Sequence, residues 1–408
     1  MQSITSFNRN FFNASEESEM HERFSQVFMA IEEENEDSGS SEIPFLPLSR
    51  LNNASERREC LEIIGEVIRT GCFTSGPYIG LVERKLRKMY DGHTCVATAS
   101  GTDAIKIALK SVGVGVGDEV IMPVNSFAAT ENAVLAIGAI PVFANIDRSY
   151  NINPSEVDRL RNKRTKAVLP VCLYGSTKNM REVYLRSKES DISVVIDAAQ
   201  CFGIKSVIEH SDVMALSFNP FKNIGSFGKS GAIITRSPEL AQAARQYSYH
   251  GFAEGKKNIK AQDWGLNSRM DNLQAATLSV KLGHFEVNSA KRCLLAARYH
   301  LLLKDLSTHI DLPSERVENT WHLYPLYLRN GNRNELIAFA HQNGVELDVY
   351  YPVLSHSGIH DLARNYPDKA QFRPSEQVHS GLIHIPLHNH MSFREQDRVS
   401  EVLHAFFR

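Results

Sequence analysis

Two residues of the 408-residue chain, each placed after a predicted buried strand, could perform chemistry together. One strand ends in Asp197, and another runs into Lys222 and a glycine-rich stretch. A carboxylate buried at a strand end needs a cationic or N–H partner, which a protonated heteroaromatic nitrogen would supply. A lysine in a low-dielectric site has a lowered pKa and a nucleophilic amine. Taken singly, the acid could be a helix N-cap and the lysine a solvated side chain.

Two further segments could bind an anion or shape a loop. Ser100-Gly101-Thr102 opens a predicted helix at 102–112, and the unpaired N–H groups of a helix N-terminus suit a phosphate. An ordinary Ser/Thr N-cap is the alternative. The segment 265–271, which holds Asn267 and Arg269, precedes another helix and by itself indicates a turn and a cap.

The elements that would position these residues alternate between apolar strands and helices. Such near-continuous apolar strands predict an α/β fold with a mostly parallel sheet and helices on both faces. Ligands of such sheets bind at the carboxyl ends of the strands, where Asp197 and Lys222 fall. The expected strands are 119–122, 141–145, 167–172, 193–196, 213–218 and 232–235, and the expected helices include 102–112 and 128–137.

Composition predicts three regions. Residues 1–42 form an acidic tail or arm, in which Phe24, Val27, Phe28 and Ile31 fall at helical spacing. This region is either a solvated tail or an arm that packs on a partner subunit. Residues 43–290 form the large domain, and 291–408 form a smaller C-terminal α/β domain. Its expected elements are 320–328, 333–342, 345–350 and 396–407.

The charge balance and the cysteines exclude several classes of protein. Lys plus Arg (45) nearly equals Asp plus Glu (47), so neither nucleic acid nor a membrane is an expected partner. The six cysteines show no CxxC spacing, so neither a metal site nor a disulfide framework is expected.

The apolar run 133–144 is too short to span a membrane and no secretory signal is seen, so a cytoplasmic protein is expected. The glycines at 113, 115 and 117 follow a predicted helix, whereas the dinucleotide-binding motif follows a strand and opens a helix. A Rossmann dehydrogenase is therefore only a weak alternative.

Several motifs, taken together, resemble the DegT/DnrJ/EryC1/StrS sugar aminotransferases, which are enzymes of fold type I that depend on pyridoxal 5'-phosphate (PLP). The motifs are SGTDAI, PVNSFAATENAVLAIGAIPVFANID, VLPVCLYG, IDAAQ, LSFNPFKNIGSFGKSGAIIT and GLNSRMDNLQAA. The resemblance implies that Lys222 attaches the cofactor and moves protons, and that Asp197 pairs with the ring nitrogen. It also implies a homodimer with composite active sites. The other implied cofactor contacts are Gln200 with the ring hydroxyl, Phe127 with the ring face, and Gly101, Thr102, Ser217 and the partner-supplied Asn267 with the phosphate.

The segments YSYHGF and LDVYYPVLSH are similar to family members that aminate 3-oxo-glucose 6-phosphate with glutamate in kanosamine-type antibiotic biosynthesis. A nucleotide-linked 3- or 4-ketosugar or a keto-inositol is the alternative acceptor, and a non-catalytic PLP-binding sensor is a more distant reading. Structural roles are the alternative for the aromatic and histidine residues, and solvation is the alternative for the lysines. The residues expected near the substrate are Tyr249, His250, Arg269, Tyr350 and His356, with Lys256 and Lys257 as further candidates for anion contacts.

Overall fold

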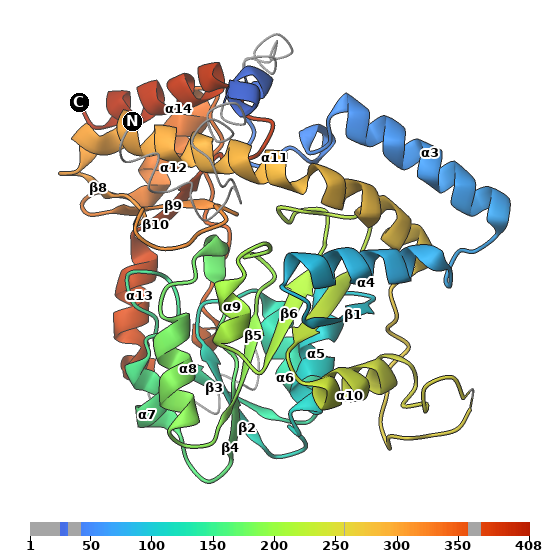
Figure 1. Cartoon of the computed structure of the whole chain (residues 1–408). Helices are drawn as coiled ribbons and strands as arrows, with labels where there is room; N and C mark the ends of the chain where they lie inside the picture. Colours follow the sequence, from blue (N-terminus) through green and yellow to red (C-terminus); the bar gives the residue numbers. More distant parts are fainter. Residues whose placement is uncertain (1–24, 32–41, 257, 358–368) are drawn as a thin grey trace.

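A seven-stranded sheet lies at the centre of the computed structural model, which describes residues 25–31, 42–256, 258–357 and 369–408 (Figure 1). The strand order is β1-β7-β6-β5-β4-β2-β3. Only β7 runs antiparallel to its neighbours, so the predicted mostly parallel sheet is confirmed. The strands are β1 Thr94–Thr98, β2 Glu119–Pro123, β3 Ile140–Ala144, β4 Thr165–Val168, β5 Ser193–Asp197, β6 Val213–Ser217 and β7 Gly231–Thr235.

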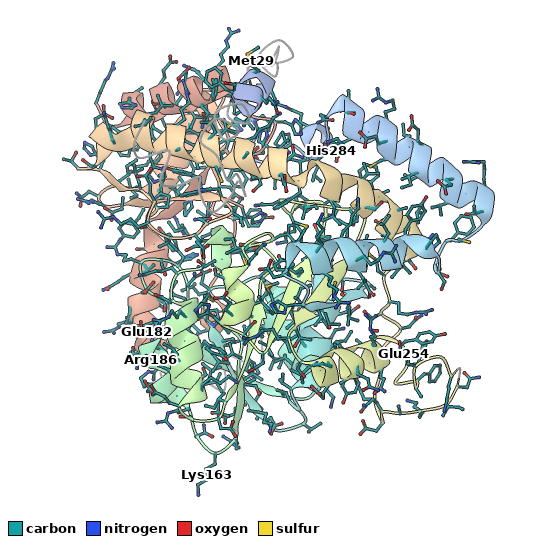
Figure 2. The ribbon with its side chains drawn as sticks, in the orientation of Figure 1. Met29, Lys163, Glu182, Arg186, Glu254 and His284 are labelled. Atoms are coloured by element: carbon teal, nitrogen blue, oxygen red, sulfur yellow. The ribbon has the colours of Figure 1, made fainter. Side chains whose placement is uncertain are left out.

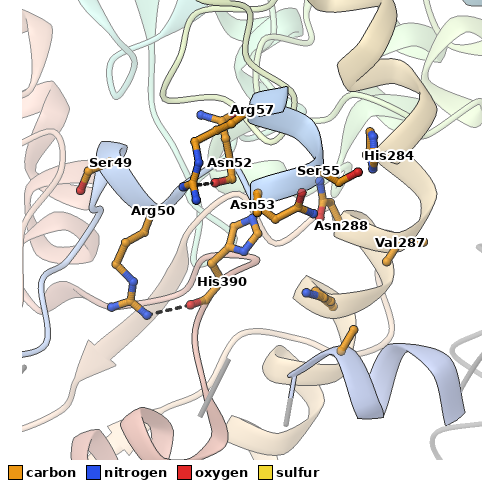
Figure 3. Close-up of a pocket in the computed structure, with 13 residues that line it drawn as sticks. Ser49, Arg50, Asn52, Asn53, Ser55, Arg57, His284, Val287, Asn288 and His390 are labelled. Atoms are coloured by element: carbon orange, nitrogen blue, oxygen red, sulfur yellow. Dashed lines mark hydrogen bonds between the residues drawn. The ribbon is translucent and has the colours of Figure 1, made fainter. Parts of the chain in front are cut away.

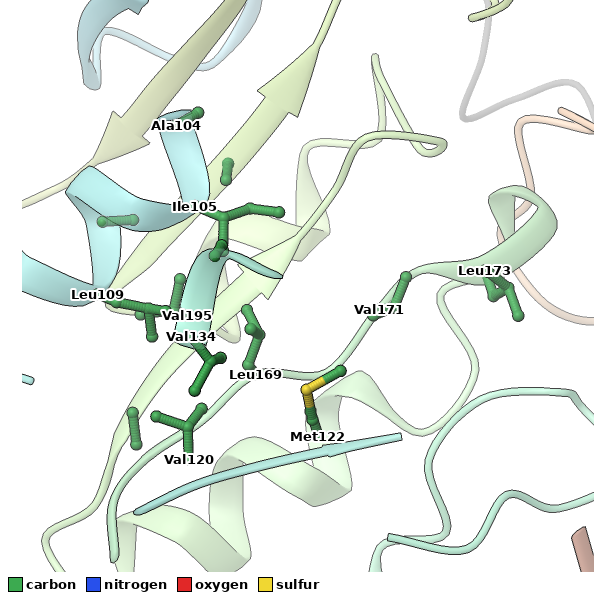
Figure 4. Close-up of a cluster of buried hydrophobic side chains, with 14 of the residues drawn as sticks. Ala104, Ile105, Leu109, Val120, Met122, Val134, Leu169, Val171, Leu173 and Val195 are labelled. Atoms are coloured by element: carbon green, nitrogen blue, oxygen red, sulfur yellow. The ribbon is translucent and has the colours of Figure 1, made fainter. Parts of the chain in front are cut away.

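Helices cover both faces of this sheet, as expected. Alternate residues of a strand point to opposite faces, and both sets are buried here, which is why the strands form continuous apolar runs. In β5, Val195 joins the cluster under α5 and α6 that Figure 4 shows, whereas Val194 and Ile196 face away from it. The covering helices are α4 Pro77–Met89, α5 Gly101–Ser111, α6 Ala128–Ala136, α7 Ser155–Leu160, α8 Met180–Lys188, α9 Ser206–Glu209 and α10 Pro238–Ser248.

Charged side chains lie on the outer faces of the covering helices. On α8, Glu182 and Arg186 form an ion pair of 2.8 Å at the edge of the molecule (Figure 2). No helix within the described ranges is long and apolar enough to cross a membrane.

A smaller antiparallel sheet of order β10-β9-β8 packs with the C-terminal helices. The 32-residue helix α11 contributes to both parts, because Phe285 packs with α4 whereas Ala290 packs with the small sheet. The division at 290/291 stays a prediction. The elements outside the large sheet are α3 Ala54–Thr70, α11 Asn272–Leu303, β8 Ile310–Asp311, β9 Tyr324–Leu328, α12 Arg333–Gln342, α13 Arg373–Ser380, β10 Leu382–Ile385 and α14 Phe393–Phe406.

The helical spacing expected near the N-terminus produces a short helix at residues 25–31. Val27 and Ile31 are buried in the hydrophobic cluster around the small sheet, and the ring of Phe28 lies 5.1 Å from that of Phe393. This helix therefore packs on its own chain. Phe24 and all acidic residues of the region 1–42 except Glu42 fall outside the described residues.

One expected strand and two further expected elements differ from the structure. Strand β4 ends at Val168 rather than at 172, since Pro170 has no N–H to donate to a ladder. Residues 345–350 form only isolated bridges, Ile43 to Val345 and Asp348 to His384, so they build no strand. The element expected at 320–328 is a strand that begins only at Tyr324, because the preceding chain turns at Trp321, whose φ is +53°.

Candidate active site

Asp197 is the last residue of β5 and is only 5% exposed. One carboxylate oxygen accepts a hydrogen bond from the Thr130 hydroxyl at 2.8 Å, and the other accepts one from the Ala199 N–H at 3.1 Å. The next helix, α9, begins only at Ser206, so Asp197 is not a helix N-cap. Each oxygen thus keeps room for a further donor.

The electrostatic environment of Asp197 favours one more cationic partner. Burial raises the pKa of this carboxyl group, while the hydrogen bonds from Thr130 and Ala199 and the charge of Lys222 act in the opposite direction. A buried carboxylate keeps its charge at low cost only when positive or N–H groups surround it. A protonated ring nitrogen would complete this set.

Lys222 lies in the loop that leaves the neighbouring strand β6. Hydrogen bonds join the two ends of this loop. The Phe218 carbonyl accepts from the N–H of Ser226 at 2.9 Å and from the hydroxyl of Ser226 at 3.0 Å. Burial lowers the pKa of the lysine to about 8, and the charge of Asp197 opposes this shift. Within the described part of the chain, no hydrogen bond or ion pair engages the Lys222 ammonium group. Its amine is therefore more easily deprotonated than that of a surface lysine.

The lowered pKa predicts how Lys222 reacts in cofactor-free protein. Its modification by an amine reagent should rise with pH through a midpoint near 8, since only the neutral amine reacts. Asp197→Asn should move this midpoint lower, because the carboxylate that stabilises the ammonium ion is gone. Peptide mass spectrometry across a pH series measures both values. A midpoint near the ordinary lysine value of about 10.4 would contradict this electrostatic account.

A small cradle lies beside this pair, where α5 begins. The Ser100 hydroxyl accepts from the Asp103 N–H at 3.1 Å, so Ser100 is the N-cap of α5. Gly101 and Thr102 carry the first N–H groups of the helix. A Cβ atom added to Gly101 would lie 2.6 Å from the Ser217 Cβ atom, so glycine is needed for this approach. Helix N–H groups and a serine hydroxyl together suit a phosphate.

Gly101→Ala tests this cradle. The new methyl group should push α5 away from Ser217 and weaken cofactor binding by on the order of tenfold or more, the cost of about 1.4 kcal/mol. Titration of cofactor-free protein with PLP measures the dissociation constant. Gly65→Ala in α3 is the matched control, because nothing lies within 4 Å of a Cβ atom added there. Equal affinities for the two variants would remove Gly101 from the cradle.

Aromatic and amide groups line the approach to Asp197. Phe127 directly precedes α6 and is 57% exposed, which leaves its ring face available, and its ring lies 5.9 Å from that of Tyr351. The Gln200 amide accepts from the Tyr174 N–H at 2.6 Å and donates to the Tyr351 hydroxyl at 2.7 Å. The contact expected between Gln200 and a ring hydroxyl stays a prediction.

The predicted substrate residues of the YSYHGF and GLNSRM segments form one surface group. Tyr249 and Asn267 form a β-bridge, and the Arg269 guanidinium lies 3.7 Å from the centre of the Tyr249 ring. His250 is exposed, with its ring 5.3 Å from that of Tyr249. Asn267 and Lys256 are also exposed, whereas Lys257 lies outside the described residues.

The two remaining candidates pack against residues outside that surface group. Tyr350 is half-buried against Phe45 and Tyr351. His356 is only 1% exposed, stacks on Phe372, and lies 2.9 Å from the Glu376 carboxylate. This packing matches the structural alternative for the histidine.

Sequence reasoning missed two polar contacts of the site. Thr130, the donor to Asp197, lies in the first turn of α6, three residues after Phe127, where a helix start was already expected. Asn223 follows the lysine directly and binds the segment 320–322. Only its position beside Lys222 could have drawn attention to it.

A hollow of about 570 Å³ lies elsewhere, between α3, α11 and the 25–31 helix (Figure 3). Its lining includes the basic side chains of Arg50, Arg57 and His284. None of the predicted cofactor ligands lines it. The chemistry therefore lies at the strand ends rather than in this hollow.

The arrangement at the strand ends matches the parts of PLP. A buried acid faces a lysine amine, a helix N-terminus with a close-approach glycine suits a phosphate, and an exposed aromatic ring is available for stacking. The residues therefore fit the cofactor. The fold and the site define the class: a PLP-dependent enzyme of fold type I.

Comparisons with known proteins narrow the class. The model of the DegT/DnrJ/EryC1/StrS aminotransferase family matches residues 54–404, and the chain belongs to this family. It is 41% identical, over 89% of its length and 83% of the relative, to the 3-oxo-glucose-6-phosphate:glutamate aminotransferase of Bacillus subtilis (strain 168).

Solved structures agree with the family assignment. Crystal structures of NtdA from Bacillus subtilis with bound cofactor PMP and of DesV from S. venezuelae match with TM-scores of 0.88 and 0.83. The identities are 40% and 30%; each match covers 90% of this chain, and 86% and 98% of the respective structures. The chain is thus a PLP-dependent aminotransferase.

Proposed function

We propose that this enzyme transfers the amino group of glutamate to a ketosugar, with 3-oxo-glucose 6-phosphate as the preferred acceptor. The pairing of Lys222 and Asp197 at neighbouring strand ends carries the transamination part of this proposal. The similarity to the Bacillus subtilis enzyme, which is named for this acceptor and donor, supports the choice of substrates.

Each site residue has a role toward the bound cofactor. When bound, PLP supplies an electron-withdrawing ring that stabilises negative charge on the adjacent carbon. Asp197 keeps the ring nitrogen protonated, and Phe127 stacks on the ring. The Lys222 amine holds the cofactor in the resting enzyme and takes the proton from Cα of the amino donor. The other cofactor ligands are Gln200, at the ring hydroxyl, and Gly101, Thr102 and Ser217, at the phosphate.

The substrate would lie over the exposed side of the composite site that two subunits form. We assign the sugar and its phosphate to the surface group of Tyr249, His250 and Arg269, whose cationic and aromatic side chains suit a phosphorylated sugar. The large domain, 43–290, would hold the cofactor, and the small one, 291–408, would close the site. Six free cysteines fit a reducing cytoplasm.

Product analysis tests the acceptor. The pyridoxamine form of the enzyme is incubated with 3-oxo-glucose 6-phosphate, nucleotide-linked 3- and 4-ketosugars and a keto-inositol, and the products are identified by mass spectrometry and NMR. We expect amination of the sugar phosphate at least tenfold faster than of the others. Amination of a nucleotide sugar alone would contradict the acceptor, and a cofactor spectrum unchanged by every amino donor would favour a sensor.

We further propose a homodimer in which Asn267 contacts the phosphate bound by the partner subunit. Its exposure in the single chain supports this role. Mixing inactive Lys222→Ala protein with Asn267→Ala protein, after subunit exchange, should restore about a quarter of the wild-type sites, since half the dimers are mixed and each has one intact site. Activity that stays at the mean of the two separate variants would contradict composite sites.

A further inference from the structure

One irregular segment, residues 319–323, meets the ends of three parallel strands at the site. The Thr320 N–H donates to the Gly175 carbonyl at 3.1 Å, beyond β4, and its hydroxyl donates to the Gln200 carbonyl at 2.6 Å, beyond β5. Its own carbonyl accepts from the Asn223 side chain at 2.9 Å, beyond β6. The segment thus holds the lysine loop together with the other two strand ends.

A second bond fixes the protonation of His322. Because the Asn223 amide nitrogen donates to the Thr320 carbonyl, its amide oxygen faces His322 Nδ1, at 2.8 Å. An amide oxygen only accepts, so Nδ1 must carry the proton. Burial lowers the pKa of His322 well below its usual value, and the charges of Lys222, Arg292 and His384 lower it further. The histidine is therefore a neutral Nδ1–H donor.

The backbone around His322 is fixed by hydrogen bonds from Arg292. Arg292 of α11 is 2% exposed and donates to the carbonyls of Trp321 at 3.0 Å, His322 at 3.3 Å and Leu387 at 3.1 Å. A buried guanidinium that binds three carbonyls fixes their relative positions. The backbone turns sharply here, since Trp321 has a φ of +53°. His322 Nδ1–H therefore donates to Asn223 from a backbone segment whose position is fixed.

We propose that His322 is a positioning residue for the catalytic lysine: its Nδ1–H holds the Asn223 side chain, and Asn223 holds the loop that presents Lys222. This proposal rests on the assignment of Lys222 as the cofactor lysine and is independent of which sugar is aminated. His322 touches neither substrate nor cofactor in this role. It acts through one hydrogen bond to the residue next to the lysine.

Two substitutions at His322 distinguish a hydrogen-bond donor at the place of Nδ1 from a donor at the place of Nε2. In His322→Asn the amide nitrogen can occupy the place of Nδ1 and still donate to Asn223, whereas in His322→Gln it falls near the place of Nε2. In cofactor-free protein, the pH midpoint of Lys222 modification by an amine reagent should stay near the wild-type value in His322→Asn. In His322→Gln the midpoint should rise by about one pH unit, a roughly tenfold slower reaction at pH 7, because the released lysine loop becomes more solvated.

A double-mutant cycle completes the test. In an Asn223→Ala background, which already lacks the anchor, His322→Gln should produce no further change in the midpoint. Additive shifts, or equal midpoints for His322→Gln, His322→Asn and wild type, would overturn the proposal. Circular dichroism of each variant shows whether it is folded. If the His322→Gln protein does not fold, the Asn223→Ala protein serves as the test, and its Lys222 midpoint must then rise by about one pH unit. The readout needs no acceptor sugar, so failure of the proposed substrate leaves this test valid.

Discussion

Replacing Lys222 by alanine should abolish transamination and the near-visible absorbance band of the attached cofactor. The amine is the group that holds the cofactor and moves the proton, and a positioned proton-transfer group contributes about 10²–10⁴-fold in rate. We expect a loss of at least this size, because covalent attachment is lost as well. Steady-state assays with glutamate and absorption spectra of the purified protein measure the two effects.

Lys229→Ala is the matched control for this variant. Lys229 lies in the same glycine-rich stretch and is exposed, so its removal should leave both rate and spectrum unchanged. Normal turnover by the Lys222→Ala protein would show that another amine performs the reaction. A loss of activity in both variants would point to damage to the loop rather than to loss of a specific amine.

Asp197→Asn should bind the cofactor but transaminate at least about 10²-fold more slowly, the scale seen when one preorganised electrostatic partner is removed. The side chain keeps its shape and can keep its bond from Thr130, but it no longer stabilises a positive charge on the ring nitrogen. The first half-reaction, followed by stopped-flow absorbance with glutamate, isolates this effect from binding of the sugar.

An exposed aspartate near the start of the same strand gives the control. Asp191 lies two residues before β5, and Asp191→Asn should leave the half-reaction rate unchanged. Comparable rates for the Asp197→Asn and wild-type proteins would remove Asp197 from its role. A cofactor dissociation constant that rises in parallel with the lost rate would instead show that the carboxylate serves binding.

The sheet and the strand-end residues could be predicted because their causes are local. Strands buried on both faces form continuous apolar runs, and the helix that begins at Gly101 has its cap and its apolar face within a dozen residues. The position of Asp197 and Lys222 on neighbouring parallel strands then follows from the topology.

The contacts that complete the site depend on distant parts of the chain. Thr130 and Asp197 are 67 residues apart, and Asn223 and His322 are 99 residues apart, so no local pattern pairs them. An element was expected at 345–350, yet other parts of the chain pair with this segment only at single bridges. His356 fits a substrate role by its type, but tertiary packing buries it against Phe372.

Reduction of the holoenzyme with borohydride, followed by peptide mapping, tests the central claim most directly. The reagent makes the bond between cofactor and protein permanent, so the modified residue can be identified by mass spectrometry. We predict a phosphopyridoxyl group on Lys222, with unmodified peptide in Lys222→Ala protein treated in the same way. A cofactor group on any other lysine, or none on a protein that turns over glutamate, would contradict the account.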